Sequence, residues 1–269
     1  MGRIEEKFHN LKENGEKALI TYIMAGTPDL HTTEGLIIEL EKQGVDLIEL
    51  GVPFSDPLAD GPTIQAAGLR ALKSGTTLPG ILHLVSNIRR RVEIPVILMS
   101  YLNPIYHYGI SKFFQDAKIK GVDGLIIPDL PLEESKEMAD LAGQNGIDLI
   151  FLITPTSSIQ RIKKISFMSK GFIYYVSLTG VTGARENLAD EVGPFVNKIR
   201  KWTNKPVCVG FGVSTKQQVK EILKYSDGVI VGSAVVKKIE EGRDKKDIIK
   251  KTAEFVKTLV VSAKEKQCA

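Results

Sequence analysis

The chain has 269 residues, of which 43% are hydrophobic and 25% are charged, and its formal net charge is +4. This composition excludes a disordered chain, and the mild charge, with acids among the C-terminal lysines, disfavours a nucleic-acid or membrane partner. Two cysteines, no signal-peptide pattern and no apolar run of bilayer length lead us to expect a cytoplasmic protein without a disulfide framework.

A leading helix is predicted over residues 3–14, and short apolar strands then alternate with helical segments. The strands are rich in Val and Ile and are bounded by Gly, Pro or Asp, as strands buried on both faces should be. The segments between them place apolar residues three or four positions apart, as helices do. Strands are expected at 18–26, 45–52, 95–101, 122–129, 147–154, 171–177, 206–212 and 227–233, and helices at 32–44, 111–121, 133–146, 158–169, 215–226 and, rich in Lys, from about 243.

This alternation predicts parallel strands, and eight strand–helix units indicate a single (β/α)8 barrel, or TIM barrel, over residues 1–269. The rival architecture is a doubly wound open sheet, which would need a glycine-rich turn after the first strand. The segment IMAGTPDL (23–30) lacks that G-x-G-x-x-G pattern. In a barrel, the active site is expected at the carboxyl ends of the strands.

One carboxylate lies inside the second apolar strand. Glu49 is followed by a proline-rich loop that carries Asp56 and Asp60. Burial raises the pKa of a carboxyl group, so Glu49 is suited to proton transfer near neutral pH. The alternative is a Glu held by a buried hydrogen bond without chemistry, and both aspartates could be turn residues. The position at the predicted catalytic end favours a function for Glu49.

The loops after the last two strands are predicted to hold a phosphate group. They read VGFGVST (209–215) and IVGSAVV (230–236). Glycines let backbone N–H groups approach an anion, and a helix that starts near Ser233 adds its N-terminal dipole. Tight turns alone are the alternative, but barrels commonly bind phosphate at these two loops. The long segment 177–192 is either a mobile lid or a plain connection.

The remaining residue types narrow the chemistry. The four histidines are scattered and make no metal-ligand spacing with acids at strand ends, so no metal site is expected. No lysine ends a predicted strand, which argues against a Schiff-base aldolase, and the sequence lacks a triphosphate-binding loop. Acid–base chemistry by carboxylates on a phosphorylated ligand remains.

The string IELGVPFSDPLADGPTIQ (48–65) resembles a hallmark of the tryptophan synthase alpha subunit family. The resemblance continues through GLIIPDLPLEES (124–135), YYVSLTGVTGAR (174–185), GFGVS (210–214) and VGSAVVKKIE (231–240), and it covers essentially the whole chain. It implies a retro-aldol reaction that cleaves indole-3-glycerol phosphate to indole and glyceraldehyde 3-phosphate.

The resemblance also implies roles for individual residues. Glu49 matches the general acid that protonates indole C3 and so makes the ring a good leaving group. Asp60 matches the residue that holds the indole N–H and stabilises positive charge there, and Tyr174 lies near the acid and the substrate. Further substrate contacts are implied for Tyr22, Met99, Ile126, Ile153, Thr182, Gly183, Phe211, Gly212, Gly232 and Ser233, with the glycines and Ser233 at the phosphate.

A partner is implied as well. The family's contact surface for a beta subunit is matched by Pro53, Asp56, Pro57, Asn103 and Pro104. That subunit would consume the indole to make L-tryptophan in an α2β2 complex and would carry pyridoxal phosphate, whereas no cofactor is expected in this chain. Three other interpretations are a stand-alone indole-3-glycerol phosphate lyase, a barrel isomerase or synthase of phosphorylated sugars or thiazoles, and a phosphate-ligand binding subunit without chemistry.

Overall fold

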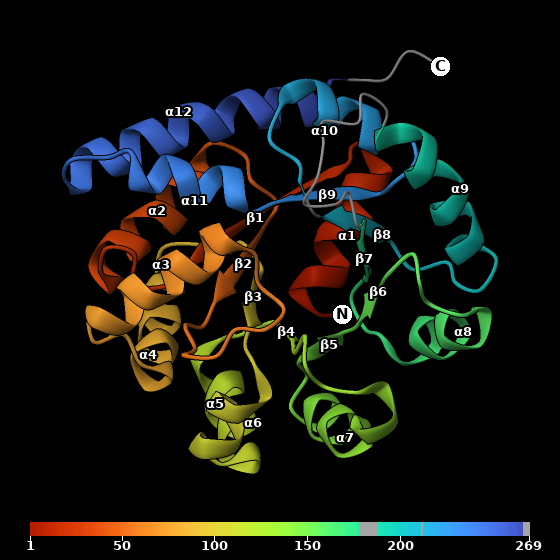
Figure 1. The fold of residues 1–269 in the computed structure, drawn as a ribbon, viewed down its shortest axis with the longest axis horizontal. Helices are drawn as coiled ribbons and strands as arrows, with labels where there is room; N and C mark the ends of the chain where they lie inside the picture. Colours follow the sequence, from red (N-terminus) through yellow and green to blue (C-terminus); the bar gives the residue numbers. More distant parts are fainter. Residues whose placement is uncertain (178–187, 211, 266–269) are drawn as a thin grey trace.

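A ring of parallel strands surrounded by helices forms the molecule in the computed structural model, which describes residues 1–177, 188–210 and 212–265 (Figure 1). All neighbouring strands pair in parallel. The strands assigned in these ranges are β1 Ala18–Met24, β2 Leu47–Gly51, β3 Val96–Met99, β4 Gly124–Ile126, β5 Asp148–Ile150, β6 Leu152–Ile153, β7 Ile173–Val176, β8 Val207–Gly210 and β9 Gly228–Val231.

The helices lie outside this ring, except for α1. They are α1 Arg3–Glu13, α2 Leu30–Lys42, α3 Pro62–Lys73, α4 Leu78–Ile88, α5 Leu102–Tyr108, α6 Ile110–Lys120, α7 Lys136–Gln144, α8 Ile159–Met168, α9 Leu188–Arg200, α10 Lys216–Leu223, α11 Ser233–Glu240 and α12 Lys245–Lys264, with a 3-10 helix at Leu132–Glu134. The crossovers from β2 to β3 and from β3 to β4 each carry two helices, more than the sequence pattern predicted. Within the described ranges, no helix combines the length and apolar character needed to span a membrane.

The predicted fifth strand is divided in two at Phe151. The strands are ordered β5-β4-β3-β2-β1-β9-β8-β7-β6, so β5 and β6 stand at opposite ends of the order. Because β5 pairs with β4 and β6 pairs with β7, this one stretch of chain joins the two ends and closes the ring. The eight predicted strands are therefore the strands of the barrel, and the (β/α)8 fold is confirmed.

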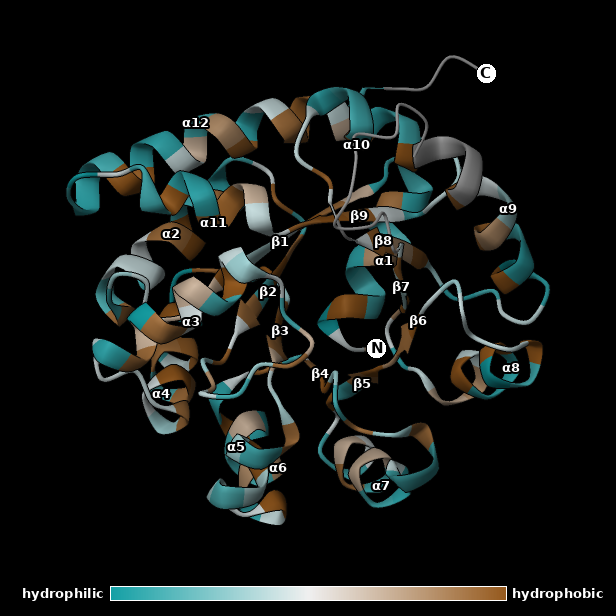
Figure 2. Cartoon of the chain, viewed as in Figure 1, coloured by the Kyte–Doolittle hydropathy of each residue, from teal (hydrophilic) through white to brown (hydrophobic). Residues whose placement is uncertain are grey.

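Side chains alternate between the two faces of each strand and build two apolar layers. On β1, Leu19 and Ile23 pack in the outer layer between the strands and the helices, whereas Ala18 and Ile20 pack in the barrel interior. The strands are accordingly hydrophobic along most of their length, and the helices carry hydrophobic stripes between hydrophilic ones (Figure 2).

The extra helix α1 closes the amino-terminal end of the barrel. Its buried residues Ile4, Phe8 and Leu11 join the interior layer. The rings of Phe8 and Phe172, just before β7, lie 5.7 Å apart between centroids. Arg3 holds the start of the helix through an ion pair with Asp123 at 3.1 Å. The barrel is thus filled from its amino-terminal end, and the carboxyl ends of the strands form its open side.

Truncation of Phe8 tests this packing. We expect Phe8→Ala to lower the free energy of unfolding by about 3 kcal/mol, because it leaves a cavity against the barrel interior. Urea unfolding followed by circular dichroism measures the loss. The matched control is His9→Ala on the exposed face of the same helix, for which a change below about 0.5 kcal/mol is expected. Equal losses in both variants would contradict the role assigned to α1.

Candidate active site

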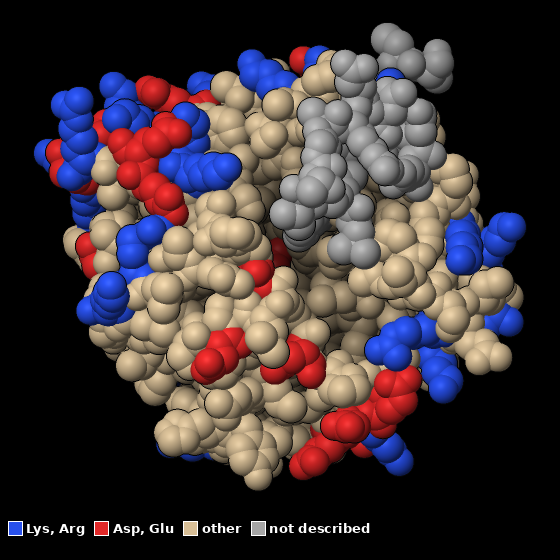
Figure 3. Space-filling view, viewed as in Figure 1, with Lys and Arg blue, Asp and Glu red and all other residues tan. Residues whose placement is uncertain are grey.

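The space-filling view shows a hollow near the middle of one face, with acidic side chains within it and at its edge (Figure 3). Glu49 is an acidic residue of the barrel interior. It lies on β2 in register with Tyr22 of β1 and Ile97 of β3, and only 1% of its surface is exposed. Because Leu47, two positions earlier, packs in the interior layer, the side chain of Glu49 also points into the barrel.

Burial controls the protonation of Glu49. Loss of water around the carboxyl group, and secondarily the negative charge of Asp60, raise the pKa of Glu49 to about 8. At neutral pH the group therefore carries a proton that it can donate.

Asp60, in contrast, is ionised at neutral pH. It lies in the loop between β2 and α3, and burial raises its pKa to about 6, whereas a hydrogen bond with Tyr101 acts to lower it. The loop is fixed around it, since the Ala59 N–H donates to Tyr101 Oη at 2.9 Å and Gln65 Nε2 donates to the Asp60 carbonyl at 2.9 Å. One carboxyl that is protonated and one that is ionised thus lie close together, an arrangement suited to acid–base work.

Buried Tyr22 and half-buried Tyr174 complete the surroundings of Glu49. A Cβ atom at Gly51 would lie 2.1 Å from Tyr22 Oη, and one at Gly210 would lie 2.7 Å from Tyr174 Oη. Each ring therefore occupies space that a larger residue at the end of a neighbouring strand would fill. Burial and the charge of the nearby carboxylates raise both phenol pKa values well above the ordinary range. Both tyrosines stay neutral at physiological pH.

Apolar side chains form the wall beneath these groups. Ile126 and Met99 belong to the interior layer, as does Leu152 beside Tyr174. Ile153 does not, because it packs in the outer layer against the helices. The prediction of Ile153 as a ring contact is therefore corrected: the alternation of the broken fifth strand turns Leu152, not Ile153, into the barrel.

The loops after β8 and β9 lie next to each other, because these strands pair. Gly212 has a φ of +72°, a conformation that favours glycine. α11 begins at Ser233 directly after β9, with Gly232 as its N-cap, so its N-terminal dipole lies at the carboxyl end of the barrel. This arrangement fits an anion. Thr182, Gly183 and Phe211, which the sequence also placed at the substrate, are outside the described residues.

The predicted partner surface is only partly at the surface. Asp56 and Asn103 are exposed, and Pro57 and Pro104 are half-buried. Pro53 is buried within the chain, so of the five it offers the least area to a partner. Two apolar side chains that the prediction omitted lie in the same segments and are largely exposed: Leu58 at 94% and Tyr106 at 70%.

In the described part of the chain, no cluster of three or more His, Cys, Asp or Glu could hold a metal ion.

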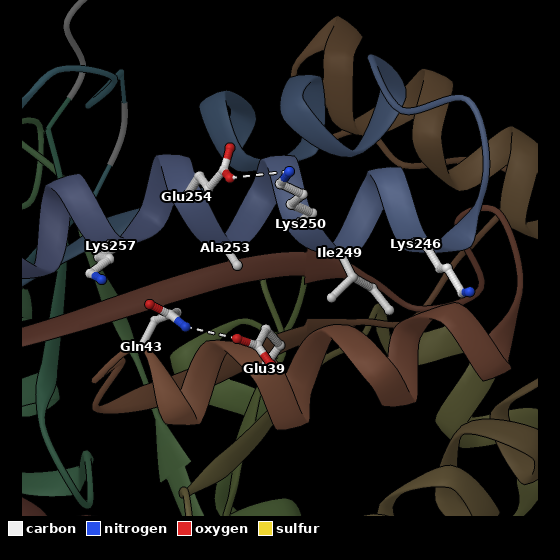
Figure 4. A pocket seen from close by; sticks show the side chains of 8 residues that line it. All are labelled: Glu39, Gln43, Lys246, Ile249, Lys250, Ala253, Glu254 and Lys257. Atoms are coloured by element: carbon white, nitrogen blue, oxygen red, sulfur yellow. Dashed lines mark hydrogen bonds and ion pairs between the residues drawn. The ribbon is translucent and has the colours of Figure 1, made fainter.

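A shallow groove of about 450 Å³ lies outside the barrel, between α2 and α12 (Figure 4). Its charges are partly paired, since Gln43 donates to Glu39 at 2.7 Å and Lys250 lies 4.0 Å from Glu254. The active-site candidate is the barrel mouth, where Glu49 and Asp60, both with raised pKa values, lie close together.

Comparison with known proteins agrees with this geometry. A family model described as "Tryptophan synthase alpha chain" matches residues 8–264. The chain belongs to this family. Among curated members of the tryptophan synthase alpha chain family, it is 57% identical over 243 residues to that of Geotalea uraniireducens, covering 90% of this chain and 91% of the relative. It is 48% identical over 259 residues to that of a Thermoanaerobacter species, covering 96% and 98%.

Solved structures show the same relation. The crystal structure of tryptophan synthase subunit alpha from Legionella pneumophila is 36% identical to this chain, with a TM-score of 0.91 and coverage of 98% of both chains. The resemblance read from the sequence is thereby confirmed for the family and for the barrel fold.

Buried Glu49 is expected to reduce stability as the pH rises. Its pKa is about 8 in the folded chain and about 4.3 in an unfolded one. The unfolded chain therefore loses the proton first, and the free energy of unfolding falls as the pH rises between these values. Glu49→Gln avoids this loss. We expect it to be more stable than the parent by about 4 to 5 kcal/mol at pH 8 and by little near pH 4.5.

Urea unfolding at the two pH values measures this difference. Glu254→Gln, on the exposed face of α12, serves as the control and should change stability by less than about 0.5 kcal/mol at either pH. A gain for Glu49→Gln that is equal at both pH values would show that the raised pKa is not its cause.

Proposed function

We propose that this chain is the alpha component of a tryptophan synthase and cleaves indole-3-glycerol phosphate to indole and glyceraldehyde 3-phosphate. Family membership supports the reaction. The observation that carries the mechanism is the pair of acids at the barrel mouth, with Glu49 protonated and Asp60 ionised near neutral pH. The remaining assignments follow from what this reaction needs.

Glu49 supplies the proton that starts the cleavage. Its carboxyl group protonates indole C3, and the ring becomes a cationic indolenine that can accept the electrons of the breaking bond. The resulting carboxylate then takes the proton of the adjacent glycerol hydroxyl. As the hydroxyl becomes the aldehyde carbonyl, the bond to C3 breaks, its electrons return to the ring, and neutral indole forms. Glu49 ends the cycle protonated, as it began.

Asp60 stabilises the charge that this sequence creates. Its carboxylate accepts a hydrogen bond from the indole N–H, where positive charge develops once C3 is protonated. The neutral phenol of Tyr174 lies beside the acid and helps to orient the substrate. An apolar wall of Tyr22, Met99, Ile126 and Leu152 would enclose the ring, and Leu152 replaces Ile153 in this role.

The phosphate binds at the loops after β8 and β9. Gly212, Gly232 and Ser233 provide backbone N–H groups and a hydroxyl at the start of α11. Thr182, Gly183 and Phe211 are assigned to the same substrate by the family resemblance. The phosphate end and the two carboxyl groups would thus fix the substrate at opposite ends, which positions C3 at the acid.

The indole released here would pass to a beta subunit in an α2β2 complex. Asp56, Pro57, Asn103 and Pro104 are the proposed contacts, and exposed Leu58 and Tyr106 add apolar area to the same surface. Pyridoxal phosphate belongs to the beta subunit in this proposal, and the alpha chain needs no cofactor and no metal. The assembly is proposed to act in the cytoplasm.

Indole release tests the proposed function. The purified chain is incubated with indole-3-glycerol phosphate, with and without a tryptophan synthase beta subunit, and indole is followed by absorbance. We expect slow release by the chain alone and at least a tenfold increase with the beta subunit, because partner binding orders a site that depends on surface loops. Fast release that the beta subunit leaves unchanged would indicate a stand-alone lyase. No release in either mixture would refute the reaction.

The pH dependence tests the two acids. We expect kcat/KM to be highest between about pH 6 and pH 8, because Asp60 must be ionised and Glu49 must be protonated. The rate should therefore fall below this range as Asp60 gains a proton and above it as Glu49 loses one. Glu49→Gln should reduce kcat by at least about 1000-fold while substrate still binds. A profile that keeps rising above pH 9 would exclude Glu49 as the acid.

A further inference from the structure

Tyr101 holds the loop between β2 and α3 at two points. It lies two positions after β3, as the N-cap of α5, and is 5% exposed. Its ring lies against that of Phe54, with 5.3 Å between centroids and 33° between the planes. Its hydroxyl oxygen accepts a hydrogen bond of 2.9 Å from the backbone N–H of Ala59. Tyr101, in the short connection between β3 and α5, thus contacts the loop on both sides: at Phe54 near its start and at Ala59 directly before Asp60.

The hydroxyl group of Tyr101 can also donate a hydrogen bond. Once the oxygen has accepted the Ala59 N–H, its own O–H remains to be donated. Ala59 directly precedes Asp60, so we infer that the carboxylate of Asp60 is the acceptor, and an interaction with this phenol acts to lower the pKa of Asp60 against the effect of burial. Burial and the charge of Asp60 raise the pKa of Tyr101 to about 12, so the phenol keeps its proton throughout the working pH range.

We propose that Tyr101 is a positioning residue for Asp60: its hydroxyl, itself oriented by the Ala59 N–H, holds the carboxylate in the ionised form and in one orientation toward the ring of the substrate. The proposal rests on the proposed function for its catalytic consequence, but not for the hydrogen bond itself. Tyr101 does not touch the reacting atoms, and it acts through Asp60.

Among the residues that the structure describes, few other groups can titrate beside Asp60 or Tyr101. Asp129, which accepts the Leu102 N–H at 2.9 Å, faces Tyr101 from the loop after β4. Glu49 of β2 lies near it, and the phenols of Tyr22 on β1 and Tyr174 on β7 also face the carboxyl groups. These two phenols stay protonated far above neutral pH, and Glu49 titrates at about pH 8. A change in the acid limb of the rate profile is therefore assigned to Asp60.

The variant Tyr101→Phe removes the hydroxyl and keeps the ring on Phe54. We expect the acid limb of kcat/KM to move up by about one pH unit, so that activity at pH 6 falls roughly 5- to 10-fold while activity near pH 7.5 changes less than threefold. KM should stay within about twofold. The matched control is Tyr108→Phe, which deletes another tyrosine–carboxylate hydrogen bond, 2.6 Å to Asp116, at a distance from the site. It should leave the profile unchanged.

A second variant separates the hydroxyl from the ring. Phe54→Leu weakens the ring contact but keeps Tyr101 Oη, so it should lower kcat without moving the acid limb. An unmoved limb in Tyr101→Phe, or an equal shift in Phe54→Leu, would overturn the proposal.

Titration of the Asp60 carboxyl by carbon-13 NMR in the free protein supplies a readout that needs no turnover. We expect a pKa higher by about one unit in Tyr101→Phe than in the parent. An equal pKa in both proteins would overturn the proposal even if indole is released. A raised pKa in a chain that releases no indole would support the hydrogen bond and refute the proposed function instead, so the two failures are distinguishable.

Discussion

Burial of the Glu49 carboxyl group in the barrel interior is the constraint on which the site depends. A carboxyl group in contact with water would be ionised at neutral pH and could not donate a proton to carbon. The structure prevents ionisation by burying Glu49 on a strand between two others, with the rings of Tyr22 and Tyr174 nearby. Those rings fit because Gly51 and Gly210 leave room for them. The barrel thus holds an acid whose burial is unfavourable for stability at neutral pH but keeps the proton that the chemistry needs.

Asp60, the neighbouring acid, has a lower pKa than Glu49 because it lies in a loop and not on a buried strand. Asp60 lies outside the strand, less deeply buried, and a phenol hydrogen bond opposes the effect of burial on its pKa. The contact between the tilted rings of Phe54 and Tyr101 and the Ala59 hydrogen bond attach the loop to the residues after β3 as well as to β2. The two carboxyl groups therefore differ in pKa because β2 buries Glu49, whereas Asp60 lies in a loop that Tyr101 contacts.

Much of the fold and part of the site could be predicted from the sequence, and the remaining predictions failed for physical reasons. Strand–helix alternation gave the barrel, and Glu49 inside an apolar strand indicated a raised pKa. The error at Ile153 arose because a side-chain alternation cannot be phased without the structure, and one residue reverses the face. The burial of Pro53 could not be predicted, because proline occurs in both buried and exposed loops. Tyr101 was missed because a tyrosine just after an apolar strand carries no pattern, and its partners lie 42 and 47 positions earlier.

At Phe151 the chain changes from pairing with β4 to pairing with β7, and this has a consequence for contacts with other proteins. An open sheet ends in strands whose backbone groups are free to pair with another chain. Here β5 and β6, taken as one strand, supply the last two neighbours, and each strand in the described ranges is paired on both sides. The barrel therefore offers no template for strand addition. Any assembly with other proteins must be made by side chains on helices and loops, where specificity is set residue by residue.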